Sequence, residues 1–526
     1  MVCITHAVLT VDLTQAQSEP EDETVAQNNL GLAYQAMGQY DQAIEYFELA
    51  LASNLSAYGE NHPKVAIGRN NLGEAYSQLG QYDNAIKYFK LALLSSMNAY
   101  KEGHPHVSVY GHNLDSNPST YDEDHPHAAV YLNNLGSTYQ ALGQYELAIE
   151  QFELALAENL TIYGKDHPYI AIDRHNLGLT YVSLEQYGKA IEHFKLALAS
   201  SLHTYGEDHP DIAIYRNDLG SVYQALGHYQ QAIKLYKLAL ASDLNTYGKT
   251  HATTARDYNK LGLAYQAMGQ FDLAIEYFKQ ALSSSLHILG EAHPHVVQYR
   301  NNLGMVYQAL GKYTQAIDYF ELALTANLNA HGEAHPDVAK DHNNLGLTYQ
   351  ALGQFESAMK HFERALAANQ AVHGETHPDV VKGYRHLGST YAILGQYDQA
   401  INQYQLALAT ALRTYSEDHP VVALQRNNLG QAYQALNQHE IAIDYFELAL
   451  AANLNNHNAN TADVAMDYNN MGLSYKALGQ YSQAIQCFFK ALSILQEKLP
   501  TDHPAINVLK HNISTIHQPS QTKIVQ

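Results

Sequence analysis

The sequence predicts an all-α solenoid of stacked antiparallel helix pairs, and three regularities carry this prediction. Asn-Asn-Leu-Gly or a close variant returns every 42 residues, apolar residues recur at helical spacing, and a short Gly-Gln or Gly-His turn divides each period. Such a period indicates supersecondary elements that bury their apolar faces only against their neighbours. The repeat glycines are Gly31, Gly73, Gly136, Gly178, Gly220, Gly262, Gly304, Gly346, Gly388, Gly430 and Gly472; every step is 42 residues except Gly73 to Gly136, which is 63.

The composition indicates which partners and which cellular compartment to expect. A chain of 526 residues exceeds what one globular core supports, whereas a repeat array grows along one axis. The formal charge is −22, with only 30 Lys and Arg spread along the chain, so we expect no nucleic-acid partner. No apolar run reaches the ~18 residues of a membrane span, so we expect no membrane insertion. Two distant cysteines and the lack of a basic leader predict a cytoplasmic protein.

One repeat illustrates the first helix and its start. His209-Pro210 precedes the first apolar-periodic segment, and proline suits the first helical position because its missing N–H costs nothing there. Asp211 complements the positive end of the helix dipole. Ten of the fourteen prolines follow a histidine in this way, so His-Pro pairs are predicted helix starts.

The second helix is predicted to approach the first closely at the repeat glycine. A glycine within a helix costs ~1 kcal/mol relative to alanine, so eleven at one phase indicate a place where a side chain would collide with the paired helix. Ala43, Ala85 and Ala148 mark the matching position on the second helix. Phenylalanines such as Phe47 and Phe89 are expected to fill the space between repeats.

These positions carry a family resemblance. Leu30-Gly31, Tyr34, Ala43, Phe47 and Ala50 resemble the tetratricopeptide repeat. The 42-residue length and the Gly-Glu-Asp-His-Pro linker are similar to kinesin light chains and their bacterial relatives, which implies a right-handed superhelix and a bacterial source. The chain departs from the family where Leu55 replaces the usual proline. It also departs four residues before the glycine, where Arg or Tyr often replaces a large apolar residue: Arg69, Arg174, Arg216, Arg300, Arg426, Tyr258, Tyr384 and Tyr468.

The predicted organisation has one interruption. We expect a tail over 1–21, repeats 1–2 over 22–104, a truncated half repeat over 105–125, repeats 4–12 over 126–503, a closing helix over 504–517 and a tail over 518–526. Aligned with its neighbours, the chain lacks 21 residues after Leu114, and Pro118 biases Asn117 away from helical geometry. One short helix is predicted over 106–116. The break over 112–122 is either a neutral deletion or a hinge.

No catalytic constellation is identified, so we expect no enzyme activity and no cofactor. The thirty histidines are interpreted mainly as linker residues that cap or pack beside their prolines. Equivalent histidines of successive repeats lie at least ~9–10 Å apart, too far to share one metal ion at ~2.1 Å bonds, so we expect no metal site.

The asparagines before each repeat glycine are the candidate binding residues. Asparagine is a mediocre helix-interior residue, so two such positions per helix call for a reason. The resemblance implies that this face lines the concave groove, where amides would bond the backbone of a bound peptide. The alternative is that the asparagines bond each other between repeats. The candidate groove residues are Asn28, Asn29, Asn70, Asn71, Asn133, Asn134, Asn176, Asn217, Asp218, Asn259, Lys260, Asn301, Asn302, Asn343, Asn344, Arg385, His386, Asn427, Asn428, Asn469 and Asn470, with Gln224, Gln266, Gln308, Gln350 and Gln434 one turn on.

Two functions are compatible with these patterns. The first is a non-enzymatic scaffold whose groove binds a peptide segment of another protein, which the variation within the asparagine columns favours. The second is a structural or self-assembling array without a dedicated ligand, which the evenness of the repeats favours. The sequence leaves self-association open.

Overall fold

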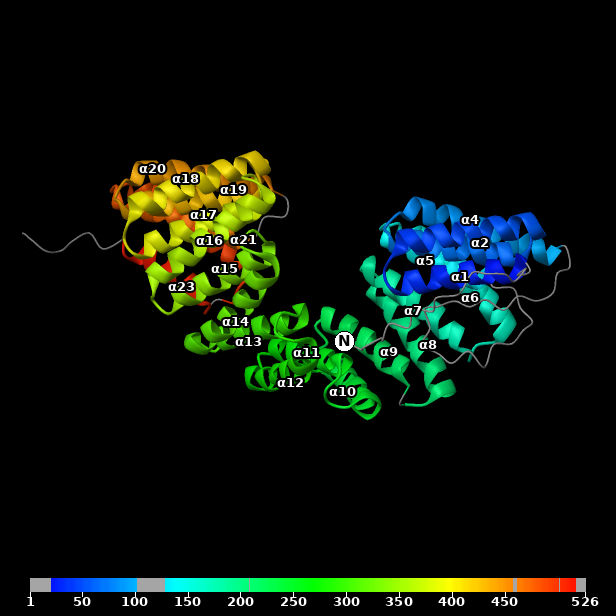
Figure 1. Ribbon diagram of the computed structural model, residues 1–526. Helices are drawn as coiled ribbons and strands as arrows, with labels where there is room; N and C mark the ends of the chain where they lie inside the picture. Colours follow the sequence, from blue (N-terminus) through cyan, green and yellow to red (C-terminus); the bar gives the residue numbers. More distant parts are fainter. Residues whose placement is uncertain (1–19, 102–127, 208, 457–460, 501, 517–526) are drawn as a thin grey trace, which may run out of the picture. The chain divides into compact units, whose positions relative to one another are not determined.

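The computed structural model describes residues 20–101, 128–207, 209–456, 461–500 and 502–516. Over these residues the chain forms 23 α-helices and no strand, which confirms the predicted all-α class. Consecutive helices pair within each repeat (Figure 1). The chain divides into two compact bodies, Met1–Lys249 and Thr250–Gln526. Among the described helices, none is both long and apolar enough to cross a membrane.

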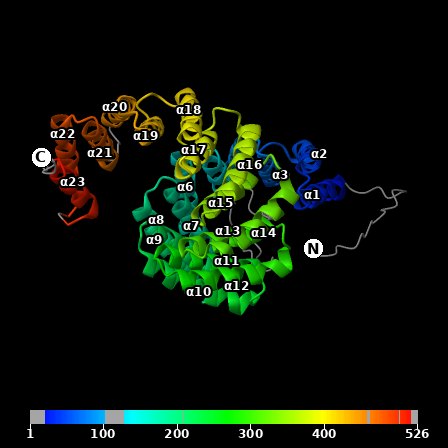
Figure 2. The same cartoon turned by 90° about the vertical axis from the view of Figure 1, so that its left-hand side faces the viewer.

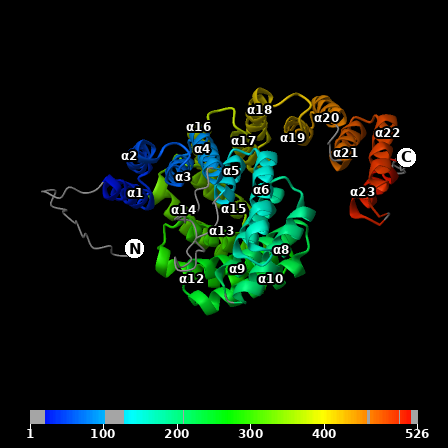
Figure 3. The ribbon, with the colours of Figure 1, turned by 90° about the vertical axis from the view of Figure 1, so that its right-hand side faces the viewer.

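Each repeat has a first helix and a second helix, and the second is the longer in every described repeat except the last. In the N-terminal body the pairs are α1 (Pro20–Ala36) with α2 (Tyr40–Tyr58), α3 (Pro63–Gln78) with α4 (Tyr82–Lys101), α5 (Ala128–Ala141) with α6 (Tyr145–Tyr163), α7 (Pro168–Ser183) with α8 (Tyr187–Tyr205), and α9 (Pro210–Ala225) with α10 (Tyr229–Tyr247). Figure 3 shows several of these pairs from the side.

The C-terminal body continues this plan (Figure 2). Its pairs are α11 (Ala252–Ala267) with α12 (Phe271–Leu289), α13 (Pro294–Ala309) with α14 (Tyr313–His331), α15 (Pro336–Ala351) with α16 (Phe355–His373), α17 (Pro378–Ile393) with α18 (Tyr397–Thr414), α19 (Pro420–Ala435) with α20 (His439–Asn455), and α21 (Thr461–Ala477) with α22 (Tyr481–Gln496), followed by α23 (Pro504–Ser514).

Linker histidines cap the first helices, as the sequence indicates. The Nδ1 atom of His62 accepts the backbone N–H of Lys64 at 3.2 Å, and His209 accepts that of Asp211 at 3.3 Å. This bond satisfies one of the N–H groups that a helix start leaves without an intrahelical partner. The ring of Tyr205, at the end of the preceding helix, stacks on His209 with centroids 4.0 Å apart. The His-Pro pair therefore both starts a helix and packs against the previous one.

The repeat glycines lie against an aromatic ring of the second helix of their own repeat. A Cβ atom at Gly304 would lie 2.5 Å from Phe320 Cε1, and one at Gly346 would lie 2.5 Å from Phe362 Cε1. Both rings are fully buried. The collision predicted from the recurrence of glycine at one position of each repeat is confirmed. The equivalent rings of Phe89, Phe152 and Phe194 belong to one core that continues between repeats, as expected for the phenylalanines.

Buried arginines explain the family departure four residues before the glycine. Nη1 of Arg300 donates to the backbone carbonyl oxygens of Glu291 and Leu322, both at 3.3 Å, and Nη2 donates to the Glu291 carboxylate at 2.9 Å. Arg300 thereby ties the linker before its helix to the second helix of its own repeat. Equivalent bonds are made by Arg69, Arg216 and Arg426.

The ends of the repeat array lie close to the predicted boundaries. Helix α1 begins at Pro20, two residues inside the expected tail. Helix α23 packs on α22 and buries Ile506 and Leu509. Residues 102–127 lie outside the described residues, so the helix over 106–116 and both readings of the break over 112–122 stay predictions.

We expect Gly304→Ala to destabilise the protein by about 1–3 kcal/mol, because the new methyl group overpacks the ring of Phe320. Gly188, in the first turn of α8, is the control, since a Cβ there has no neighbour within 4 Å. Gly188→Ala should stabilise by up to ~1 kcal/mol. Chemical denaturation followed by circular dichroism measures both changes. Equal effects of the two substitutions would contradict the close-approach argument.

Candidate functional site

The first helices of successive repeats are joined by a ladder of asparagine side chains. The amide two residues before one repeat glycine donates to the side-chain oxygen three residues before the previous one. First helices of neighbouring repeats also contact each other directly at α3 with α5, α5 with α7, and α19 with α21. The rungs are Asn71 to Asn28 (2.9 Å), Asn134 to Asn70 (2.9 Å), Asn176 to Asn133 (3.1 Å), Asn302 to Asn259 (2.8 Å), Asn470 to Asn427 (3.4 Å) and Asn512 to Asn469 (3.1 Å).

Three asparagines, each three residues before a repeat glycine, also hold a buried aspartate of the next repeat. Asn301 Nδ2 donates to one carboxylate oxygen of Asp341 at 2.8 Å, and Asn327 Nδ2 donates to the other at 2.6 Å. Asp341 has no exposed surface. Asp173 is held in the same way by Asn133 and Asn159, and Asp467 by Asn427 and Asn453. Both polar atoms of Asn133 and Asn427 are thus bonded to the neighbouring repeat, as the alternative interpretation of the asparagines requires.

Where the sequence departs from asparagine, the ladder either changes chemistry or is interrupted. His175 Nε2 lies 2.7 Å from a carboxylate oxygen of Asp218, in the place of an asparagine rung. The two departures therefore compensate each other between repeats. The rung from Asn344 to Asn301 is not made: Asn344 Nδ2 and Asn301 Oδ1 are buried without a hydrogen-bond partner.

Most of the glutamines one turn on also contact protein groups. Gln350 Nε2 donates to the hydroxyl of Thr390 at 3.0 Å, and Gln434 Nε2 donates to that of Ser474 at 2.8 Å. Gln224 accepts the Tyr236 hydroxyl at 3.0 Å. Gln266 and Gln308 are half-buried on the same face.

The remaining candidates differ in exposure. His386 stacks on Phe362 with centroids 5.0 Å apart, and burial lowers its pKa to about 4, so it carries no charge at neutral pH. Asn217 is buried. Asn29 is exposed, and Lys260, Asn343, Arg385 and Asn428 are half-buried.

Within each body, a column of exposed side chains lies on this face of the first helices, six residues before the repeat glycine. Positions −6, −3, +1 and +4 relative to the glycine share one side of a helix. The column is apolar in part and basic in part. Its exposed members are Val25, Ile214, Arg256, Gln298, Lys340, Lys382, Leu424 and Met466.

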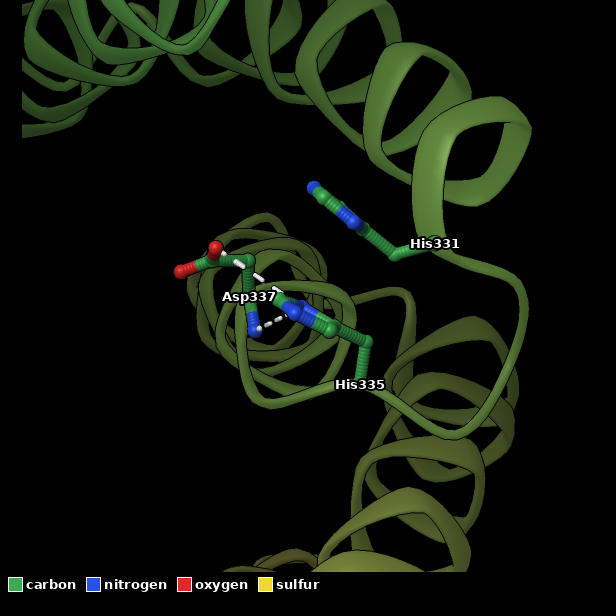
Figure 4. A group of neighbouring side chains, drawn as sticks. All are labelled: His331, His335 and Asp337. Carbon is green, nitrogen blue, oxygen red and sulfur yellow. Dashed lines mark hydrogen bonds and ion pairs between the residues drawn. The ribbon is translucent and has the colours of Figure 1, made fainter. Parts of the chain in front are cut away.

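Two groups of side chains in linkers of the C-terminal body could hold a metal ion. His331, His335 and Asp337 place ligand atoms within 4.8 Å of one another (Figure 4), and so do His373, His377 and Asp379. Histidines of successive repeats are too far apart to share one ion, but a His-x-x-x-His spacing is present within each of these linkers.

The buried aspartates were also missed, although a signal for them exists in the sequence. Asp173, Asp341 and Asp467 each lie five residues before a repeat glycine, and each has an asparagine 14 residues earlier. Where tyrosine takes the aspartate position, at Tyr215 and Tyr299, the residue 14 positions earlier is serine. The two positions change together in these repeats, whereas Asp257 has Asp243 at that separation, and Gly68 and Gly383 have Asn54 and Asn369.

Paired helices, a glycine seam and a polar ladder between first helices define a helical-repeat protein. The tetratricopeptide repeat family model matches residues 22–93, 126–202, 175–245, 229–286, 296–371, 342–412, 379–455 and 420–497, and a second model of this repeat matches 259–330. The chain belongs to the tetratricopeptide repeat family. Proteins with this fold are generally non-enzymatic scaffolds that bind other proteins.

Solved structures include similar repeat proteins. Kinesin light chain-like repeats of Podosopora anserina, nearly identical to one another, are 26% identical, with a TM-score of 0.36 over 39% of this chain and 98% of that chain. BtubC (BKLC) of P. vanneervenii is 18% identical, with a TM-score of 0.34 over 58% and 96%. The apo form of RapI is 15% identical, with a TM-score of 0.49 over 70% and 98%. No curated protein matches the chain.

The buried carboxylate of Asp341 should make stability depend on pH. Burial raises its pKa from 3.8 to about 6, so its favourable contribution is complete below about pH 4 and is lost as pH rises through 6. Asp341→Asn removes this dependence and also replaces one accepted hydrogen bond. The stability advantage of the wild type over Asp341→Asn should therefore shrink by about 1 kcal/mol between pH 5 and pH 7.5.

Urea denaturation at both pH values measures this difference, and contributions shared by the two proteins, such as those of the histidines, cancel. Asp318→Asn, at an exposed position of α14, is the control and should show little change with pH. An advantage that is constant or grows toward pH 7.5 would contradict the argument.

Proposed function

We propose that this protein is a scaffold that binds an extended peptide segment of another protein along the exposed face of its first helices. One observation carries the proposal: the chain repeats almost every structural position, yet the exposed column six residues before the glycine changes chemistry from repeat to repeat. Positions that build the fold have a structural reason to be uniform. Variation in an exposed column supports a surface adapted to a ligand.

The ladder narrows which residues would contact that ligand. Amides that already bond a neighbouring repeat, such as those of Asn133 and Asn427, have part of their hydrogen-bonding capacity engaged, which leaves less for a peptide backbone. The proposed contacts are therefore the exposed column together with Asn29, Asn343, Asn344, Arg385, Asn428, Gln266 and Gln308.

The charge of the column indicates the partner's chemistry. In the C-terminal body Arg256, Lys340 and Lys382 are exposed on this face, whereas the whole chain carries −22. Exposed cations on one face of an acidic protein would attract a segment rich in Asp and Glu. We therefore propose an acidic, extended segment for α11–α17.

Arg256→Glu with Lys340→Glu should weaken binding of an acidic peptide by roughly tenfold, because two exposed charge pairs contribute up to ~1 kcal/mol each. The peptide is selected from a displayed random library with the wild-type protein and measured by fluorescence anisotropy. Added salt should weaken the wild-type complex and leave that of the variant nearly unchanged.

The matched control is Lys312→Glu with Lys360→Glu, which makes the same change in net charge at exposed positions next to and on second helices. This control should bind the peptide nearly as well as the wild type. Equal weakening by both variants would indicate a net-charge effect and refute the first-helix face.

A self-assembling array is the second candidate, and one observation favours it. Leu30 of α1 is 45% exposed, whereas its equivalents Leu72 and Leu303 are fully buried. End-to-end contact between copies would cover this face. Light scattering after size-exclusion chromatography should then show concentration-dependent oligomers that Leu30→Gln reduces, and a monomer at all concentrations would exclude the array.

A further inference from the structure

Two consecutive linkers of the C-terminal body carry almost the same unusual sequence. Residues 331–340 read HGEAHPDVAK, and residues 373–382 read HGETHPDVVK. Their first histidines replace an aromatic or aliphatic residue of the other described linkers: Tyr58, Tyr163, Tyr205, Tyr247, Leu289 and Tyr415. The replacement puts a second imidazole beside the capping histidine in these two linkers.

The geometry gathers three metal-ligating groups at a helix junction. His331 is the last residue of α14, His335 caps α15, and Asp337 lies in the first turn of α15 (Figure 4). His335 Nδ1 is 3.7 Å from a carboxylate oxygen of Asp337, and the ligand atoms of all three residues lie within 4.8 Å of one another. Donors around a tetrahedral ion with ~2.1 Å bonds are ~3.4 Å apart, so small side-chain rotations bring these groups into range.

The helix cap selects the form of His335 that a metal ion requires. Its Nδ1 accepts the Asp337 backbone N–H at 3.2 Å, so Nδ1 carries a lone pair and no proton. An ion at Nδ1 would replace this one hydrogen bond. The rings of His331 and His335 stack with centroids 4.0 Å apart and an interplanar angle of 13°, so one must turn before both donate to one ion. His331 is exposed and ends its helix, which leaves it room to rotate.

We propose that His331, His335 and Asp337, and equally His373, His377 and Asp379, each bind a divalent transition-metal ion such as Zn²⁺. Two imidazoles and one carboxylate suit this class of ion, and water completes the coordination. Each ion joins the end of one repeat's second helix to the start of the next repeat's first helix. Bound metal therefore fixes the angle between consecutive repeats at α14–α15 and α16–α17.

The two sites differ in one neighbour. Lys382 Nζ lies 2.8 Å from a carboxylate oxygen of Asp379, whereas among the described residues no lysine forms an ion pair with Asp337, whose carboxylate lies 3.7 Å from His335. A bound ion must displace the Lys382 ammonium from Asp379. The site at His331 is therefore the tighter of the two.

The test is a Zn²⁺ titration of the full chain by isothermal calorimetry, with imidazole resonances followed by NMR. The matched variant is His331→Tyr with His373→Tyr, because tyrosine stacks on the linker histidine at this position elsewhere, as at Tyr415 and His419. The wild type should bind two more ions per chain than this variant. Each single variant should lose one.

A second pair of variants tests the metal sites without changing His331 or His373, whose rings stack on the capping histidines. Asp337→Asn should weaken the tighter site at least tenfold, and Lys382→Ala should strengthen the weaker one. Thermal unfolding without metal verifies that all variants fold. Equal Zn²⁺ stoichiometry in the wild type and the double tyrosine variant would overturn the proposal, as would unchanged resonances of His331 and His373 on titration.

Discussion

The contact between each repeat glycine and the aromatic ring of its paired helix is the constraint on which the rest of the structure depends. With no Cβ at Gly304, the ring of Phe320 lies where that atom would be, and the two helices approach closely. Close-packed interiors tolerate little change in such a place. Because the same contact recurs at one position of each repeat, every pair has nearly the same geometry. The side chain two residues before one glycine then comes within hydrogen-bonding distance of the side chain three residues before the previous one.

The polar ladder is a consequence of that regular spacing. An amide carries both donor and acceptor, so one residue type can pair with its own copy in the next repeat. Buried polar groups are costly unless they are bonded, and the asparagines of the ladder bond across the boundary between repeats. Asp341 extends this principle to a carboxylate, whose burial raises its pKa to about 6. Because these amides bond between repeats, the proposed binding surface is the exposed column that includes Arg256 and Lys340.

Local features of this protein were predictable where neighbouring residues settle the outcome. The period, the His-Pro helix starts and the glycine seam follow from spacing and backbone chemistry, and the structure has all three. The capping role of His335 follows likewise from its place before Pro336. Spacing within one linker would also have revealed the pair of His331 and His335, because a separation of four residues is visible in the chain.

The sequence by itself determined the class of the fold and the phase of every helix pair, because glycine, proline and apolar spacing act over short stretches of chain. Only the tertiary structure decided what the asparagines do. Whether an amide faces a ligand or the next repeat depends on the distance between side chains 43 residues apart, as for Asn302 and Asn259. That distance is set by how tightly neighbouring repeats pack, which no single repeat encodes alone.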